Sequence, residues 1–184
     1  MVAKSRKDVT LSDMFESRDD MTGQPWNFHI FHYISPYVSY FFARFIPLTP
    51  NQISYIWGFL GVFGSFFIAL GGYWNMVIGI LIYHFAILLD YIDGEIARAM
   101  DCKTIGGTYL DRFFHYLHRG TLVLGLGIGH WRMTGDIWFL TMGVSACLFF
   151  TFDNLNKLKI YETLVNEDRF DLLKKRKEKS VAGQ

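Results

Sequence analysis

The sequence predicts an all-α protein, a polytopic bundle of transmembrane helices preceded by an interfacial helix. Of its 184 residues, 51% are hydrophobic and 18% aromatic, which is high for a soluble domain of this size. Residues 52–89 contain no Asp, Glu, Lys or Arg. This run is about twice as long as an α-helix needs to cross roughly 30 Å of hydrocarbon, so it predicts two spans. Further apolar segments near 107–129 and 136–155 predict two more.

The chain begins with polar and aromatic-rich segments. Residues 1–24 are polar and mixed in charge, which predicts a polar cytoplasmic N-terminus. Residues 25–47 are dense in aromatic side chains but interrupted by polar ones. We predict an aromatic-rich helix lying in the headgroup layer, because Trp and Tyr bury their rings while a polar edge stays wet. A fifth span of about 18 residues is the alternative.

Residues 48–156 form the predicted transmembrane bundle. Thr49 is suited to cap its first helix, with Pro50 at the first helical position. The Gly-rich, aromatic turn at 71–75 divides the uncharged run into spans near 52–70 and 75–98. Residues 157–184 form a basic tail, whose first part has the pattern of an amphipathic helix.

The distribution of basic residues predicts the orientation in the membrane. Lys and Arg gather before the first span, at the second connection and in the tail, whereas the 71–75 turn has none. Basic residues are retained on the cytoplasmic side, so both termini and the second connection are expected in the cytoplasm. We therefore predict an integral protein of the inner or plasma membrane, with four spans.

Carboxylates accumulate where the second and third spans meet. Asp90 and Asp93 lie three residues apart, and Asp111 and His115 lie four apart. At about 100° of rotation per residue, each pair shares one helix face, so two packed helices could place all four around a common centre. Acidic groups at a bilayer edge cost several kcal/mol unless a cation or an ionic network neutralises them.

Oxygen ligands of this kind suit Mg²⁺ or Mn²⁺. Two such ions about 3.5–4 Å apart, bridged by carboxylates, are a common device for displacement at phosphorus. The sequence therefore indicates phosphoryl or phosphatidyl transfer. The simpler alternative is that Asp90 or Asp93 pairs with Arg98 or Arg112 at the membrane edge.

These residues match a family pattern. The pattern is an Asp, two residues, Asp-Gly, two residues, Ala-Arg, then a Gly and an Asp at fixed distances; it falls on Asp90, Asp93, Gly94, Ala97, Arg98, Gly107 and Asp111. The chain thus resembles the integral-membrane CDP-alcohol phosphatidyltransferases over about residues 48–155. Pro50-Asn51 also resembles the usual opening of the first span in that family. A pattern with this many fixed points is far more specific than one short motif.

The resemblance implies an enzyme of phospholipid biosynthesis. A small alcohol would attack a CDP-linked lipid donor, CDP-diacylglycerol in the first instance, with release of CMP. The resemblance also implies a homodimer surrounded by membrane lipid, with no nucleic-acid partner. It assigns metal binding to Asp90, Asp93 and Asp111. Contacts to the nucleotide fall to Asn51, Asp90, Gly94, Ala97, Arg98, Gly107 and Asp111.

Two departures from the family keep alternatives open. His115 replaces the fourth acidic residue, which serves as base and metal ligand. Imidazole can take a proton near neutral pH and can bind Mn²⁺, so His115 is the candidate catalytic base and fourth ligand. The replacement also removes a negative charge from the site. Two alternatives therefore remain: a site with one metal ion, or a non-catalytic family member that binds nucleotide, metal or a partner. The family usually has six spans and this sequence predicts four, so the family's last two helices are expected to be missing here.

Three basic residues near the cluster are candidates for binding an acceptor or a phosphate: Lys103, Arg112 and Arg119. Arg119 lies two helical turns beyond Asp111, and we expect it to point toward the same cavity. Glu95 falls between the motif positions and is expected to face the surface or another subunit. A cation channel would explain the carboxylates but not the Gly and Arg spacing.

Overall fold

The computed structural model describes residues 6–18 and 26–166, where every regular element is a helix. A short 3-10 turn, η1, and six α-helices follow one another: η1 Arg6–Asp8, α1 Leu11–Glu16, α2 Trp26–Phe45, α3 Pro50–Leu70, α4 Tyr73–Ala99, α5 Ile105–Thr134 and α6 Ile137–Asn166. The all-α prediction is confirmed. Parts of the predicted polar N-terminus and most of the basic tail lie outside the described residues.

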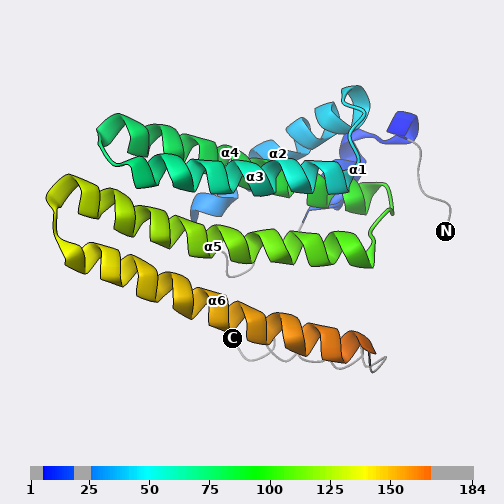
Figure 1. Cartoon of the computed structure of the whole chain (residues 1–184). Coiled ribbons are helices and arrows are strands. Elements are labelled where there is room, and N and C mark those ends of the chain that lie inside the picture. Colours follow the sequence, from blue (N-terminus) through cyan, green and yellow to red (C-terminus); the bar gives the residue numbers. More distant parts are fainter. Residues whose placement is uncertain (1–5, 19–25, 167–184) are drawn as a thin grey trace.

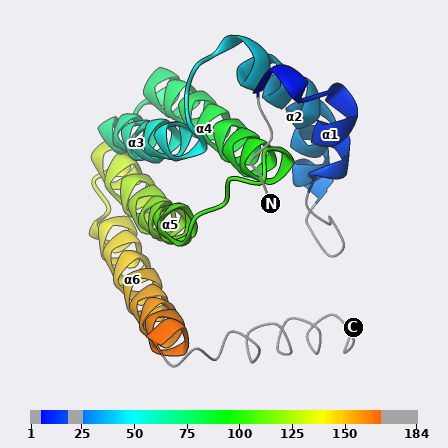
Figure 2. The ribbon, with the colours of Figure 1, turned by 90° about the vertical axis from the view of Figure 1, so that its right-hand side faces the viewer.

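The long helices form an open arc. Helix α3 packs against both α4 and α5, α5 packs against α6, and α2 lies along α4 (Figures 1 and 2). Their order across the arc is therefore α2, α4, α3, α5, α6. Because α3 to α6 alternate in direction, the start of α3, the end of α4 and the start of α5 lie at the same end of the bundle (Figure 1).

Local sequence signals determine where α3 begins and where it ends. Thr49 and Gln52 form a reciprocal capping box, and Pro50 is the first residue of α3, as predicted. Gly71 and Gly72 have φ values of 72° and 84°, a region that favours glycine, and they make the tight turn between α3 and α4.

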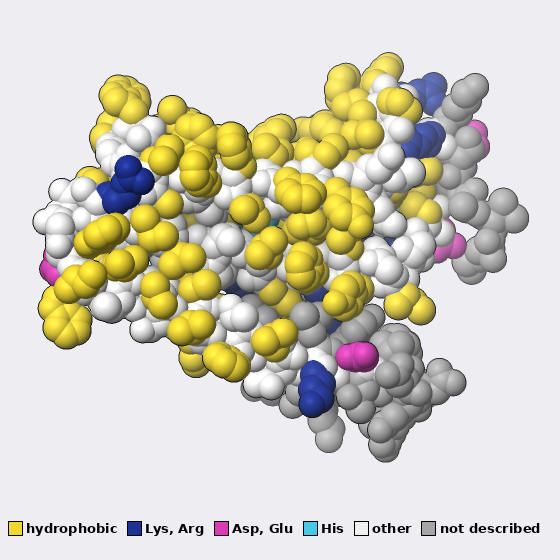
Figure 3. Space-filling view, viewed as in Figure 1, with side chains coloured by type: hydrophobic (Ala, Val, Ile, Leu, Met, Phe, Trp, Pro, Cys, Tyr) yellow, Lys and Arg dark blue, Asp and Glu magenta, His cyan; other side chains and the backbone are white. Residues whose placement is uncertain are grey.

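Three stretches are long and apolar enough to cross a membrane: Pro50–Leu70, Tyr73–Ala99 and Ile137–Lys157. Helix α5 is not among them, because its first half carries charged and histidine side chains. It nevertheless runs between α3 and α6 for 30 residues, and we treat it as a fourth span. Hydrophobic side chains are spread along the visible face, with charged ones toward the ends (Figure 3). The polytopic membrane bundle is confirmed.

Helix α2 covers one side of α4. It continues as a single helix through Pro36. Its Ser35 and Ser39 hydroxyls donate hydrogen bonds to the two carboxyl oxygens of Glu95, at 2.5 and 2.6 Å. Glu95 is only 1% exposed. The expectation that Glu95 faces the surface or another subunit is therefore wrong, because α2 packs over the side of α4 that carries it.

Candidate active site

A pocket of about 540 Å³ opens where α3, α4 and α5 meet at one end of the bundle. Helix α3 forms its floor, since it packs against the two helices that flank the pocket. The polar and charged residues that line it are Asn51, Ser54, Asp90, Asp93, Arg98, Lys103, Thr104, Thr108, Asp111, His115, His118 and Arg119. The carboxylates of the second and third spans thus share one cavity, as the helical spacing predicts.

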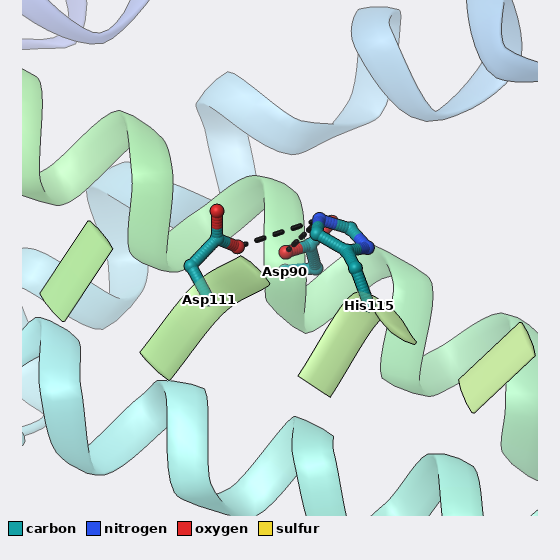
Figure 4. Close-up of side chains that lie close together, drawn as sticks. All are labelled: Asp90, Asp111 and His115. Carbon is teal, nitrogen blue, oxygen red and sulfur yellow. Dashed lines mark ion pairs between the residues drawn. The ribbon is translucent and has the colours of Figure 1, made fainter. Parts of the chain in front are cut away.

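Three of the four acidic-motif positions form a compact triad. The His115 Nε2 atom lies 3.5 Å from Asp90 Oδ1 and 3.4 Å from Asp111 Oδ1. One ligand atom from each residue lies within 4.8 Å of the others, an arrangement that could hold a metal ion. Asp90 reaches in from α4, while Asp111 and His115 stand one turn apart on α5 (Figure 4). The three side chains are only partly buried, so the triad is accessible from the pocket.

Asp93 lines the same pocket but lies outside the triad. It is 6% exposed. Its Oδ2 accepts hydrogen bonds from the Ser54 hydroxyl at 2.5 Å and from the Trp57 indole N–H at 2.7 Å. Two donors from α3 therefore hold this carboxylate toward the floor of the pocket.

Sequence reasoning did not identify Ser54 and Trp57. The signal was present, because Asn51, Ser54 and Trp57 follow at three-residue steps and so share one face of α3. An indole N–H inside an apolar helix also needs a hydrogen-bond partner. That the partner is Asp93 depends on how α3 packs against α4, which the local sequence does not specify.

All seven residues assigned to the nucleotide line this pocket: Asn51, Asp90, Gly94, Ala97, Arg98, Gly107 and Asp111. A Cβ on Gly107 would lie 2.7 Å from Asn51 Oδ1, so glycine allows α5 to approach the first turn of α3. A Cβ on Gly94 would lie 3.2 Å from the Arg98 guanidinium. The Arg98 Nε donates a hydrogen bond to the Ser17 carbonyl, which ties the end of α4 to the N-terminal segment.

Of the three basic candidates, Lys103 and Arg119 line the pocket and Arg112 does not. Lys103 belongs to the connection between α4 and α5. Arg119 stands one helical turn beyond His115 and lines the cavity, as its position on the third span predicts. With Arg98, the pocket therefore combines carboxylates with three cationic side chains.

An all-α membrane bundle with a carboxylate-rich pocket at one end is the class of protein that this fold and pocket define. Residues 47–164 match the model of the CDP-alcohol phosphatidyltransferase family, and the chain belongs to that family. Members are phosphotransferases that transfer a phosphoryl-alcohol group from a CDP-linked donor, and they use divalent metals.

A relative from Aquifex aeolicus (strain VF5), described as an uncharacterized protein, is 32% identical over 96 residues. The match covers 52% of this chain and 46% of the relative. The chain thus spans about half the length of the curated relative that it matches.

Proposed function

We propose that this chain transfers a phosphatidyl, or related phosphoryl-alcohol, group from CDP-diacylglycerol to a small alcohol with release of CMP. The observation that carries the proposal is the single pocket lined by all seven motif residues, next to the triad of Asp90, Asp111 and His115. A pocket of about 540 Å³ lies within the size range of small-molecule sites, about 300–1,000 Å³. The lipid chains of the donor would remain in the bilayer beside the bundle.

The nucleotide part of the donor would lie over the first turns of α3 and α5. Asn51 and Gly107 stand at these two helix starts, where the positive end of the helix dipole favours a negatively charged diphosphate. Arg98 at the end of α4 supplies a fixed positive charge on the opposite wall. Gly94 and Ala97 add little bulk between them, which leaves room for the ligand.

The residues present fit a divalent cation. Asp90, Asp111 and His115 would hold it, with Asp93 as a fourth family position nearby. A bound Mg²⁺ or Mn²⁺ supplies charge neutralisation on the phosphate oxygens during displacement. The family pattern suggests a site with two ions, whereas His115 in place of the fourth carboxylate favours a site with one.

His115 is the proposed proton acceptor for the attacking hydroxyl, and it is also a proposed metal ligand. Neutral imidazole has one nitrogen lone pair, so it cannot bind the ion and accept the proton at the same moment. Lys103 and Arg119, and more remotely Arg112, are proposed to attract an anionic group of the acceptor or donor.

We further propose that the protein is a homodimer of the inner or plasma membrane, with both termini and the pocket on the cytoplasmic side.

A direct assay tests the transfer. The purified protein is incubated with CDP-diacylglycerol, Mg²⁺ or Mn²⁺, and a panel of alcohols, and CMP is followed over time. We expect CMP release that depends on one acceptor. Asp111→Asn should reduce the rate by about 10³-fold or more, as expected when a group acting on transition-state charge is removed.

The matched control is Asp136→Asn. Asp136 is exposed and caps the start of α6 through the Trp138 N–H, a bond that Asn can also make. This variant should keep the wild-type rate. CDP binding without CMP release from any acceptor would instead identify the second candidate function, a non-catalytic family member that binds nucleotide, metal or a partner. Equal rates for the two Asn variants would refute the site assignment.

A further inference from the structure

The replacement of an acidic ligand by His115 changes how many ions the site can hold. A carboxylate has two oxygens and can bridge two metal ions. An imidazole offers one lone pair and binds one ion. The His115 Nε2 atom is the one that faces both Asp90 and Asp111, so this nitrogen, once it has lost its proton, would offer its lone pair to an ion held by the triad.

The triad has the spacing of ligands around a single ion. Ligands bound at about 2.1 Å in a tetrahedral arrangement lie about 3.4 Å from one another. The two separations from Nε2 are 3.4 and 3.5 Å, and the ligand atoms of all three residues lie within 4.8 Å of one another. A set of two carboxylates and one imidazole is typical of Mn²⁺, Co²⁺ or Zn²⁺, whereas Mg²⁺ prefers an octahedral shell made of oxygen.

Among the described residues, Asp90, Asp111 and His115 form the one group of three or more His, Cys, Asp or Glu side chains that could hold a metal ion. Both hydrogen bonds to Asp93, from Ser54 and Trp57, fall on its Oδ2, so this carboxylate would have only its Oδ1 left to offer to an ion and could not bridge two ions with both oxygens. Arg119 lines the same pocket one turn beyond His115. Its positive charge disfavours another dication at that end of the cavity.

We infer that this centre binds one divalent ion of the nitrogen-accepting class, through Asp90, Asp111 and His115 Nε2, in place of a pair of Mg²⁺ ions. The inference rests on the proposed function, since it specifies the metal of the same site. It assigns the His115 lone pair to the ion, so His115 could accept the proton of the attacking hydroxyl only after leaving the ion. The ion bound by this centre is thus set by the one motif position in which the chain departs from its family.

The test measures metal binding in the full chain, independently of turnover. The detergent-solubilised protein is stripped with a chelator and titrated with Mn²⁺, and bound and free ion are separated by their electron paramagnetic resonance signals. We expect one Mn²⁺ per chain, displaced by Zn²⁺ or Co²⁺ and at least tenfold less effectively by Mg²⁺. Pulsed spectra of the bound Mn²⁺ should show a directly coordinated ¹⁴N nucleus.

Two histidine variants separate ligation from structure. His115→Asp should remove the ¹⁴N coupling and gain Mg²⁺ affinity by tenfold or more, while a melting temperature near that of the wild type shows that it folds. His84→Ala is the matched control, since His84 is an exposed histidine on α4 outside the pocket lining, and it should keep the coupling.

The outcomes distinguish this inference from the proposed function. Two Mn²⁺ per chain, or one without nitrogen coupling, would overturn the single-ion centre and leave the transferase proposal standing. No bound metal at any concentration tested, together with no CMP release, would remove both. Coupling that persists in His115→Asp would show that another nitrogen is the ligand and would also overturn the inference.

Discussion

The buried contact between α2 and Glu95 yields a quantitative prediction for Glu95→Ala. Each carboxyl oxygen of Glu95 accepts one serine hydroxyl, at 2.5 and 2.6 Å, and all three side chains are at most 1% exposed. The substitution deletes both acceptors at once. Ser35 and Ser39 are then left in the interface without the partners around which α2 is packed.

A buried hydroxyl that loses its partner costs about 1–3 kcal/mol. Each serine can turn its hydroxyl to a carbonyl in the preceding helical turn, so the lower part of this range applies. The expected loss of unfolding free energy is therefore about 2–4 kcal/mol. For a chain of this length, each kcal/mol lowers the melting temperature by about 2–4 °C, which gives a decrease of about 5–15 °C.

The assay is thermal unfolding of the purified protein in one detergent, followed by the loss of the monodisperse peak in size-exclusion chromatography. Glu95→Gln is the matched control, since its amide keeps one acceptor oxygen and can donate to the other serine hydroxyl. It should lose less than half as much stability as Glu95→Ala. Replacing both serines with Ala in the Glu95→Ala background should cost little more. If Glu95→Ala melted within 1–2 °C of the wild type, roughly the effect of a neutral surface change, the reasoning would fail.

Two further substitutions, with Gly106→Ala as a control for the first, test the packing of α3. Gly129→Ala would place a Cβ 2.2 Å from the Ile68 carbonyl oxygen, so α3 and α5 must move apart and the free energy of unfolding should fall by about 1–3 kcal/mol. In the control, Gly106→Ala, the added Cβ meets nothing within 4 Å, so the melting temperature should stay unchanged or rise. Trp57→Phe removes one of the two donors to the Asp93 carboxylate. It should lower the melting temperature by a few degrees and, because that carboxylate is freer to turn toward the triad, allow a second Mn²⁺ to bind at millimolar concentration. A single ion per chain in Trp57→Phe would mean that Ser54 alone is enough to hold Asp93.

Both ends of α3, of which the first lies at the pocket, could be predicted because they follow local rules. Thr49, Pro50 and Gln52 form the capping signal that begins α3, and the glycine pair at 71–72 ends it. The shared faces of Asp90 with Asp93 and of Asp111 with His115 follow from helical rotation alone. On the assumption that the two faces pack together, helical rotation was enough to predict that the four side chains reach one cavity.

Which of those four side chains form the triad could not be predicted in the same way. Asp90 joins the triad and Asp93 does not, because Ser54 and Trp57 reach Asp93 from a third helix. The predicted location of Glu95 was wrong for a similar reason. Spacing within α4 shows that Glu95 points away from the pocket, but only the packing of α2 decides whether that side meets solvent or protein.

The spacing of the triad depends on contacts that carry no catalytic group. A Cβ on Gly58 would lie 2.3 Å from the Phe114 ring, and one on Gly61 would lie 2.0 Å from the His118 ring. These two glycines therefore let α5 settle against α3 beside His115. Since α3 also packs on α4, the same helix fixes both walls from which the triad is assembled. A methyl group at either glycine would move Asp111 and His115 relative to Asp90, so the spacing of the triad depends as much on the floor of the pocket as on the motif that lines it.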